Sequence, residues 1–179
     1  VLPMAEFNAK MRSMLIECSN FDWHKISPAI FGSMFQGVMD KKKRRELGAH
    51  YTSEENILKL IKPLFLDELY AEFERVKVDK VLLEKFHNKI ANLKFLDPAC
   101  GCGNFLIITY RELRRLELEV LKMQVDSAYI SLFDDISKLI KVNVNQFYGI
   151  EIEDFPSQIA KVGMWLMDHQ MNLEVSNYF

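Results

Sequence analysis

The stretch FLDPACGCGNF, residues 95–105, joins a short apolar run that ends in an acid to two glycines separated by a single residue. The apolar run predicts a buried strand, and the segment PACGCGN consists of residue types that form tight turns. Residues 105–124 carry apolar side chains at helical spacing and predict a long helix directly after the turn. The apolar stripe of that helix is formed by Leu106, Tyr110, Leu113 and Val120.

A second unit of the same kind follows. Residues 145–151 (NQFYGIE) predict a strand that ends at Glu151, and Asp154 is expected to cap a helix with Pro156 in its first turn. A further helical stretch, residues 128–141, is expected between the two units. Strands that alternate with helices in this way are typical of an open parallel sheet, so the predicted fold class is α/β.

The region before the glycine turn is expected to be helical. Residues 1–40 predict two short helices joined by a loop around residues 21–28, and the basic run KKKRREL at 41–47 is expected to be a solvated surface segment rather than a phosphate-binding patch. We therefore divide the chain into an N-terminal helical region, 1–47, and a partial α/β domain, 48–179. Because the chain does not begin with Met, we expect it to be a piece of a longer protein.

Helix signals are also present between these two regions. Thr52 and Glu55 have the spacing of a capping box, which would start a helix at Ser53. This helix is expected to run past Pro63 with a kink, because proline lacks the amide that a helix interior needs. The charged segment that follows, 67–91, has apolar positions at helical spacing and predicts more helix on the outside of the core.

The composition is that of an ordinary soluble globular protein, with 179 residues, 49% hydrophobic and 27% charged. The net charge of −2 gives no overall positive field and does not decide whether the protein binds DNA. No apolar segment reaches the roughly 20 residues of a membrane helix, so we expect no membrane association.

The cysteines and histidines do not form a recognisable metal or disulfide pattern. Cys18, Cys100 and Cys102 are odd in number and contain no C-x-x-C pair, which argues against a disulfide framework and a zinc site. His87 has no ligand partner nearby in the sequence, so we interpret it as a surface or packing histidine. We expect no bound metal and a reducing, cytoplasmic location.

The glycine turn predicts a ligand that carries both a carboxylate and an amine. Gly101 and Gly103 can adopt positive φ and let a ligand approach the backbone, and the helix N-terminus that follows favours an anionic group. No Gly-Lys-Ser/Thr sequence follows, which excludes a phosphate-binding loop. Leu106 stands where a dinucleotide fold has its third glycine, which argues against NAD. Asp97 would repel a pyrophosphate but could pair with an ammonium group.

The second strand adds the chemistry expected of a nucleoside site. Glu151 at its end could accept two hydroxyl hydrogens from a ribose, and Ile152 could cover one face of a purine. Taken alone, an acid at this position is equally typical of a helix cap. The combination with the glycine turn favours the ligand-binding interpretation.

Three segments resemble the amino-group DNA methyltransferases, especially those that modify adenine N6. DPACGCGNFL, residues 97–106, resembles their S-adenosylmethionine motif, and YGIEIEDFPSQIAKVGMWL, residues 148–166, resembles their ribose-binding strand and its helix. GAHYTS, residues 48–53, resembles the segment that precedes the motif where the cofactor-binding half comes first. WHKISPAIFGSMFQ, residues 23–36, is most similar to large bacterial restriction–modification chains.

The resemblance implies a partial Rossmann-like methyltransferase sheet, S-adenosylmethionine as cofactor and a set of cofactor-binding positions. In that family Asp97 and the backbone from Ala99 to Gly103 would hold the methionine end, with Phe105 packed beneath it. Tyr51 and Thr52 would close over the cofactor from the other side. The full set is Tyr51, Thr52, Asp97, Ala99, Gly101, Gly103, Phe105, Glu151 and Ile152. Structural alternatives are a helix cap for Thr52 and core packing for Tyr51 and Phe105.

Two departures from the family pattern limit what the chain is expected to do. Glu151 follows Asp97 by 54 residues, so an additional helix must be inserted between the strands. The catalytic Asn-Pro-Pro-aromatic signature and the acidic contact to the cofactor adenine are absent, so we expect no catalytic residue and an inactive chain. The parent protein would transfer methyl to adenine in DNA, which it would contact through parts outside this chain.

Three alternatives remain open at this point. RNA and protein methyltransferases share the glycine turn and the ribose acid. A nucleotide-binding oxidoreductase is disfavoured by the missing third glycine. A non-enzymatic helical interaction module is the alternative of a different class, and an exposed apolar sheet edge would then predict self-association.

Overall fold

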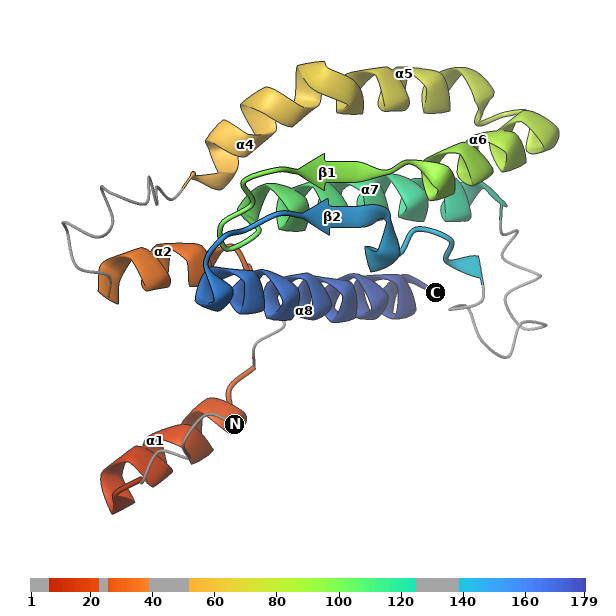
Figure 1. Ribbon diagram of the computed structural model, residues 1–179. Coiled ribbons are helices and arrows are strands. Elements are labelled where there is room, and N and C mark those ends of the chain that lie inside the picture. Colours follow the sequence, from red (N-terminus) through yellow and green to blue (C-terminus); the bar gives the residue numbers. More distant parts are fainter. Residues whose placement is uncertain (1–6, 23–25, 39–51, 125–138) are drawn as a thin grey trace.

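The computed structural model of the protein describes residues 7–22, 26–38, 52–124 and 139–179 (Figure 1). The basic run at 41–47 and most of the helix expected at 128–141 lie outside the described residues. The elements in chain order are α1 (Ala9–Ser19), α2 (Ile30–Val38), α4 (Glu54–Ile61), the π-helix η2 (Lys62–Leu66), α5 (Asp67–Val76), α6 (Lys80–Asn92), β1 (Phe95–Asp97), α7 (Asn104–Gln124), the 3₁₀ turn η5 (Val144–Gln146), β2 (Phe147–Gly149) and α8 (Asp154–Tyr178).

The two strands of the described residues form a parallel sheet at the centre of the fold. β1 and β2 run side by side in the same direction in Figure 1, and Phe95 pairs in register with Phe147. β1 leads into α7 and β2 leads into α8, in the order that the sequence predicts. The strands are shorter than expected, so that Glu151 lies beyond the end of β2 rather than in it. Parallel pairing fits the predicted α/β class, whereas two strands alone leave a Rossmann-like sheet as a proposal.

The helix α7 is the centre of the core. Its predicted stripe is confirmed, because Leu106, Tyr110, Leu113 and Val120 are all buried. Residues on its other sides are buried as well, which is expected of a helix surrounded by other elements. The sheet packs against it through Phe147, whose ring lies 4.9 Å from that of Phe95 and 5.3 Å from that of Tyr110.

The helices α4 and α5 form a continuous path through Pro63. The expected kink takes the form of the π turn η2, and Figure 1 shows the change of direction between α4 and α5. The capping box prediction is wrong, because Ser53 is the N-cap and makes no side-chain bond to the helix. Helix α4 therefore begins one residue later than predicted, at Glu54.

The segment 67–91 is helical, as predicted, and forms the two helices α5 and α6. Asp79 ends the turn between them and caps α6, since its Oδ1 accepts from Val81 N at 2.9 Å and Leu82 N at 3.0 Å. The apolar faces of both helices contribute to the main core instead of only covering it, through Leu69, Phe73, Leu83, Phe86 and Ile90.

The described residues of the N-terminal part contain the two short helices that the sequence predicts. The helices α1 and α2 are present on either side of the expected loop, and none of the residues of α1 is buried. A smaller core cluster of Ala29, Ile57, Ile61 and Ile108 joins the start of α2 and the helix α4 to α7. Within the described residues, no helix combines the length and apolar character that crossing a membrane would need.

Candidate functional site

The loops that follow the two strands are hydrogen-bonded to each other. We call residues 98–103 the β1 loop and residues 150–153 the β2 loop. Ile150 N donates to Asp97 O at 2.9 Å, and Cys100 N donates to Ile150 O at 3.0 Å. Both loops therefore leave the same edge of the sheet, where ligands of parallel α/β folds bind. The acids Asp97 and Glu151 lie at this edge together, as the sequence predicts.

Glu151 connects the two loops through its carboxylate. Its Oε2 accepts from Gly101 N at 2.9 Å, and its Oε1 accepts from Glu153 N at 2.9 Å. A carboxylate has about four lone-pair positions, so two acceptor positions remain for hydroxyl hydrogens. The expected N-cap role of Asp154 is wrong, because Glu153 is the N-cap of α8 and makes no side-chain bond to it.

The amides of the β1 loop are mostly bonded within the protein. Ala99 N donates to Asp97 Oδ1 at 3.0 Å, and Gly103 N donates to Cys100 O at 2.8 Å. The amides of Cys100 and Gly101 donate to the β2 loop. The remaining amide of the β1 loop, that of Cys102, has no acceptor among the described residues. The first amides of α7 have no acceptor within the helix. The backbone donors that remain for the predicted anionic group are therefore the Cys102 amide and the first amides of α7.

The two glycines of the β1 loop have different surroundings. Gly101 has φ +54° and Gly103 has φ +82°, the only positive values among the described residues. A Cβ on Gly103 would lie 2.8 Å from Ala160 Cβ on α8, whereas a Cβ on Gly101 would meet no atom of the described residues within 4 Å. Gly103 therefore permits close packing of α7 on α8, and Gly101 leaves open backbone surface.

The remaining predicted positions are less closely gathered. Ile152 follows Glu151 directly and is 90% exposed, so it is free to cover a ligand. Phe105 is partly buried against the smaller core cluster, which fits its structural alternative. Thr52 is half-buried before α4, and Tyr51 lies outside the described residues. The ligand-binding roles of these four residues stay predictions.

Gly149 lies where the two loops meet and was not among the predicted site residues. A Cβ at this position would lie 2.6 Å from Cys100 Sγ and 3.1 Å from Leu106 Cδ1. A side chain would therefore push the β1 loop away from the end of β2. The available signal was a glycine inside a strand, which often marks the close approach of another part of the backbone.

The thiols of the β1 loop are expected to react slowly. Burial, then the charges of Asp97 and Glu151, raise the pKa of Cys100, and burial followed by Glu151 raises the pKa of Cys102 to about 11. The reactive form is the thiolate, so at pH 8 iodoacetamide should label the exposed Cys18 first. Labelling of Cys102 should accelerate as the pH rises towards its pKa.

Mass spectrometry of digested samples checks the order of labelling. The variant Cys18→Ser should lose the fast phase. A fast phase at pH 8 that persists in this variant would contradict the burial of the loop thiols.

Among the described residues, no group of three or more His, Cys, Asp or Glu is arranged to hold a metal ion.

Comparison with known proteins places these features in a family. A model of the DNA-methyltransferase domain of MmeI matches residues 73–179. DNA methyltransferase A of Bacillus subtilis is 49% identical over 173 residues, which are 96% of this chain and 19% of that protein. The solved structure of the type IIL restriction–modification enzyme MmeI in complex with DNA is 62% identical, with a TM-score of 0.91.

The structural match covers 99% of this chain and 24% of the MmeI chain. The chain thus spans less than a quarter of the length of either relative. The resemblance to DNA methyltransferases of restriction–modification systems is confirmed by these matches. Since the matched residues 73–179 are more than half of the chain, the protein belongs to the family of the MmeI DNA-methyltransferase domain.

Proposed function

We propose that the protein is the cofactor-binding portion of a DNA adenine-N6 methyltransferase of a restriction–modification system. The observation that carries this proposal is the pairing of the two loops, which brings Asp97, the open backbone at Gly101 and Glu151 to one sheet edge. Membership in the MmeI methyltransferase family supports the same conclusion. The activity of the parent protein and its specificity for adenine are part of the proposal.

The chemistry of the edge fits S-adenosylmethionine, which would supply the methyl group on its sulfonium. Asp97 would pair with the ammonium group, and Cys102 N with the first amides of α7 would receive the carboxylate. Glu151 has acceptor positions left for the ribose hydroxyls. Ile152 is exposed beside it and would contact the adenine.

The fold proposal follows from the same features. We infer that β1 and β2 belong to a Rossmann-like sheet, because a parallel pair with crossover helices is the repeating unit of such sheets. Parallel sheets normally have both faces covered by other elements. Leu96 and Tyr148 lie on the same face of this sheet and are 63% and 50% exposed, so this face is only partly covered. This proposal also includes the division into regions 1–47 and 48–179. It further includes DNA contacts outside this chain and a cytoplasmic location.

Removing either acid is expected to weaken S-adenosylmethionine binding. Asp97→Asn and Glu151→Gln each replace a charge-assisted hydrogen bond of about 1.5 to 3 kcal/mol, which corresponds to a roughly 10- to 100-fold rise in Kd. Calorimetric titration of the full-length natural protein measures the change. Asp154→Asn is the matched control, because this exposed acid lies three residues after Glu151 and should leave Kd unchanged.

The same titration separates the alternatives. Binding of NAD in preference to S-adenosylmethionine would contradict the proposal and favour an oxidoreductase. With radiolabelled cofactor, methyl transfer to DNA should appear as N6-methyladenine. Methyl transfer to RNA or protein instead would agree with the proposed cofactor site but would contradict DNA as the substrate. No uptake of S-adenosylmethionine by the full-length protein would overturn the proposed function as a whole.

A further inference from the structure

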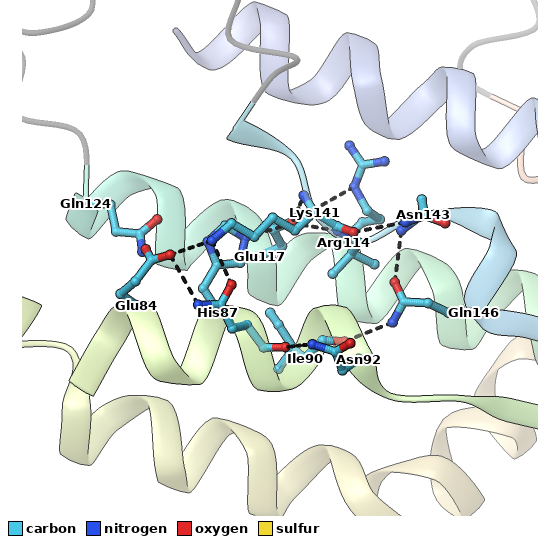
Figure 2. A network of polar contacts seen from close by, with 12 residues as sticks. Glu84, His87, Ile90, Asn92, Arg114, Glu117, Gln124, Lys141, Asn143 and Gln146 are labelled. Atoms are coloured by element: carbon cyan, nitrogen blue, oxygen red, sulfur yellow. Dashed lines mark hydrogen bonds and ion pairs between the residues drawn. The ribbon is translucent and has the colours of Figure 1, made fainter. Parts of the chain in front are cut away.

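The segment that leads into β2 is held by a buried glutamine. Gln146 is 1% exposed, and its Nε2 donates to Ile90 O at 2.9 Å and to Leu93 O at 3.0 Å. Its Oε1 accepts from Asn143 N at 2.9 Å. Figure 2 shows Gln146 between Asn143 and the end of α6. One side chain therefore ties the residue before β2 to the backbone that leads into β1.

A second buried side chain holds the same segment from the other side. Glu117 on α7 is 1% exposed, and its Oε1 accepts from Lys141 N at 2.7 Å and from Val142 N at 2.8 Å. The same oxygen lies 2.9 Å from Nε2 of the buried His87 (Figure 2). The segment from Lys141 to Gln146 is thereby fixed to α7 at its start, and Gln146 fixes its end to α6.

The strand ladder is too short to set its own register firmly. It consists of three pairs, from Phe95↔Phe147 to Asp97↔Gly149. A slip by one residue would turn every side chain of β2 to the other face of the sheet. Gln146 directly precedes the first pair, and it bonds to Leu93, which lies two residues before Phe95. The glutamine is therefore placed to fix the register where the ladder begins.

The register decides where Glu151 lies. In the observed register the β2 loop meets the β1 loop, and Glu151 Oε2 reaches Gly101 N. A slip of β2 would move Glu151 along the edge and break this bond. We propose that Gln146 is a positioning residue for the cofactor site, acting through the register of β1 and β2. This proposal rests on the proposed function, although Gln146 touches neither of the two acids.

The test compares variants of Gln146 in the full-length natural protein. Gln146→Glu keeps the acceptor but replaces the donor that bonds Ile90 O and Leu93 O. Gln146→Met removes both polar ends and keeps the volume of the side chain, and it serves where the glutamate variant does not fold. Asn145→Ala is the matched control, because Asn145 is an exposed neighbour in the same turn. Thermal unfolding of each variant confirms that it is folded.

Two readouts distinguish positioning from a purely structural role. Hydrogen exchange of the Gly101 amide should accelerate in both Gln146 variants and stay unchanged in Asn145→Ala, with or without cofactor. The KM for S-adenosylmethionine should rise about 10-fold, by analogy with the loss of a partner that orients a metal ligand, while kcat at saturating cofactor stays within about twofold. A structural role alone would lower kcat through loss of folded protein and leave KM unchanged.

Each outcome of these measurements either supports or overturns the positioning role of Gln146. Unchanged exchange at Gly101 in a folded variant would overturn the proposal, as would accelerated exchange with an unchanged KM. Wild-type protein that takes up no S-adenosylmethionine would overturn the proposed function and, with it, the positioning role. In that case accelerated exchange at Gly101 would still establish that Gln146 controls the loop geometry.

Discussion

Replacement of Glu117 by alanine is expected to lower the free energy of unfolding by about 3 to 5 kcal/mol. The carboxylate is buried and accepts from two backbone amides of the segment before β2. Its Oε2 lies 3.2 Å from Nε of Arg114, and both side chains are 1% exposed. Alanine would leave the amides of Lys141 and Val142 without this acceptor, and an unpaired buried donor costs about 1 to 3 kcal/mol.

Other contacts of Arg114 place the loss towards the lower end of this range. Its guanidinium also lies 3.2 Å from Asp168 Oδ1 and donates to Asn172 Oδ1 at 2.8 Å. The arginine therefore keeps a carboxylate partner after the substitution, and the main loss falls on the amides of Lys141 and Val142. Glu117→Gln keeps an acceptor oxygen for these amides, so it should be less destabilising than alanine.

Urea unfolding followed by circular dichroism measures this difference. Glu119→Ala is the matched control, because this carboxylate on the same helix is half exposed and pairs with Lys122 at 2.6 Å. Surface pairs contribute about 0 to 1 kcal/mol, so the control should lose little. A loss below about 1 kcal/mol for Glu117→Ala would contradict the role of this carboxylate as the anchor of the segment.

The parts of the fold that could be predicted from the sequence have local signals. The glycine turn at 97–103 and the helical period of α7 each lie within a short window and appear where predicted, whereas Glu151 lies two residues beyond the strand that was predicted to end at it. The capping prediction at Thr52 failed by one position, since neighbouring hydroxyl residues are equally suited to begin a helix. The π turn at Pro63 was predicted only as a kink, because its geometry depends on packing against the core.

The parts that could not be predicted depend on contacts between distant residues. His87 appeared to lack a partner, but its partner Glu117 stands 30 residues later on a different helix. Gln146 bonds to carbonyl groups more than 50 residues earlier. Such side chains are recognisable only once the helices are packed, because no spacing rule relates positions on separate elements. The sequence predicted two acids and a glycine turn that the structure brings to one sheet edge, whereas the side chains that support them depend on packing between distant elements.

Substitutions of the two loop glycines are expected to separate stability from cofactor binding. Gly103→Ala should lower the free energy of unfolding by about 2 to 5 kcal/mol, the sum of a left-handed backbone cost of about 1 to 2 and an overpacking cost of about 1 to 3. The overpacking arises because the new methyl would lie 2.8 Å from Ala160 Cβ and 3.2 Å from its Cα. Backbone atoms of α8 cannot move aside without shifting the helix.

Gly101→Ala should instead lower stability by only about 1 to 2 kcal/mol, since its methyl would meet no atom of the described residues within 4 Å and would incur the backbone cost alone. The space around this methyl adjoins the amide bonded to Glu151, where we propose that S-adenosylmethionine lies, so its Kd should rise more for Gly101→Ala than for Gly103→Ala in folded protein. Urea unfolding and calorimetric titration of the two variants measure both quantities. Equal losses of stability would contradict the packing role of Gly103, and unaltered binding in Gly101→Ala would place the ligand elsewhere on the sheet edge.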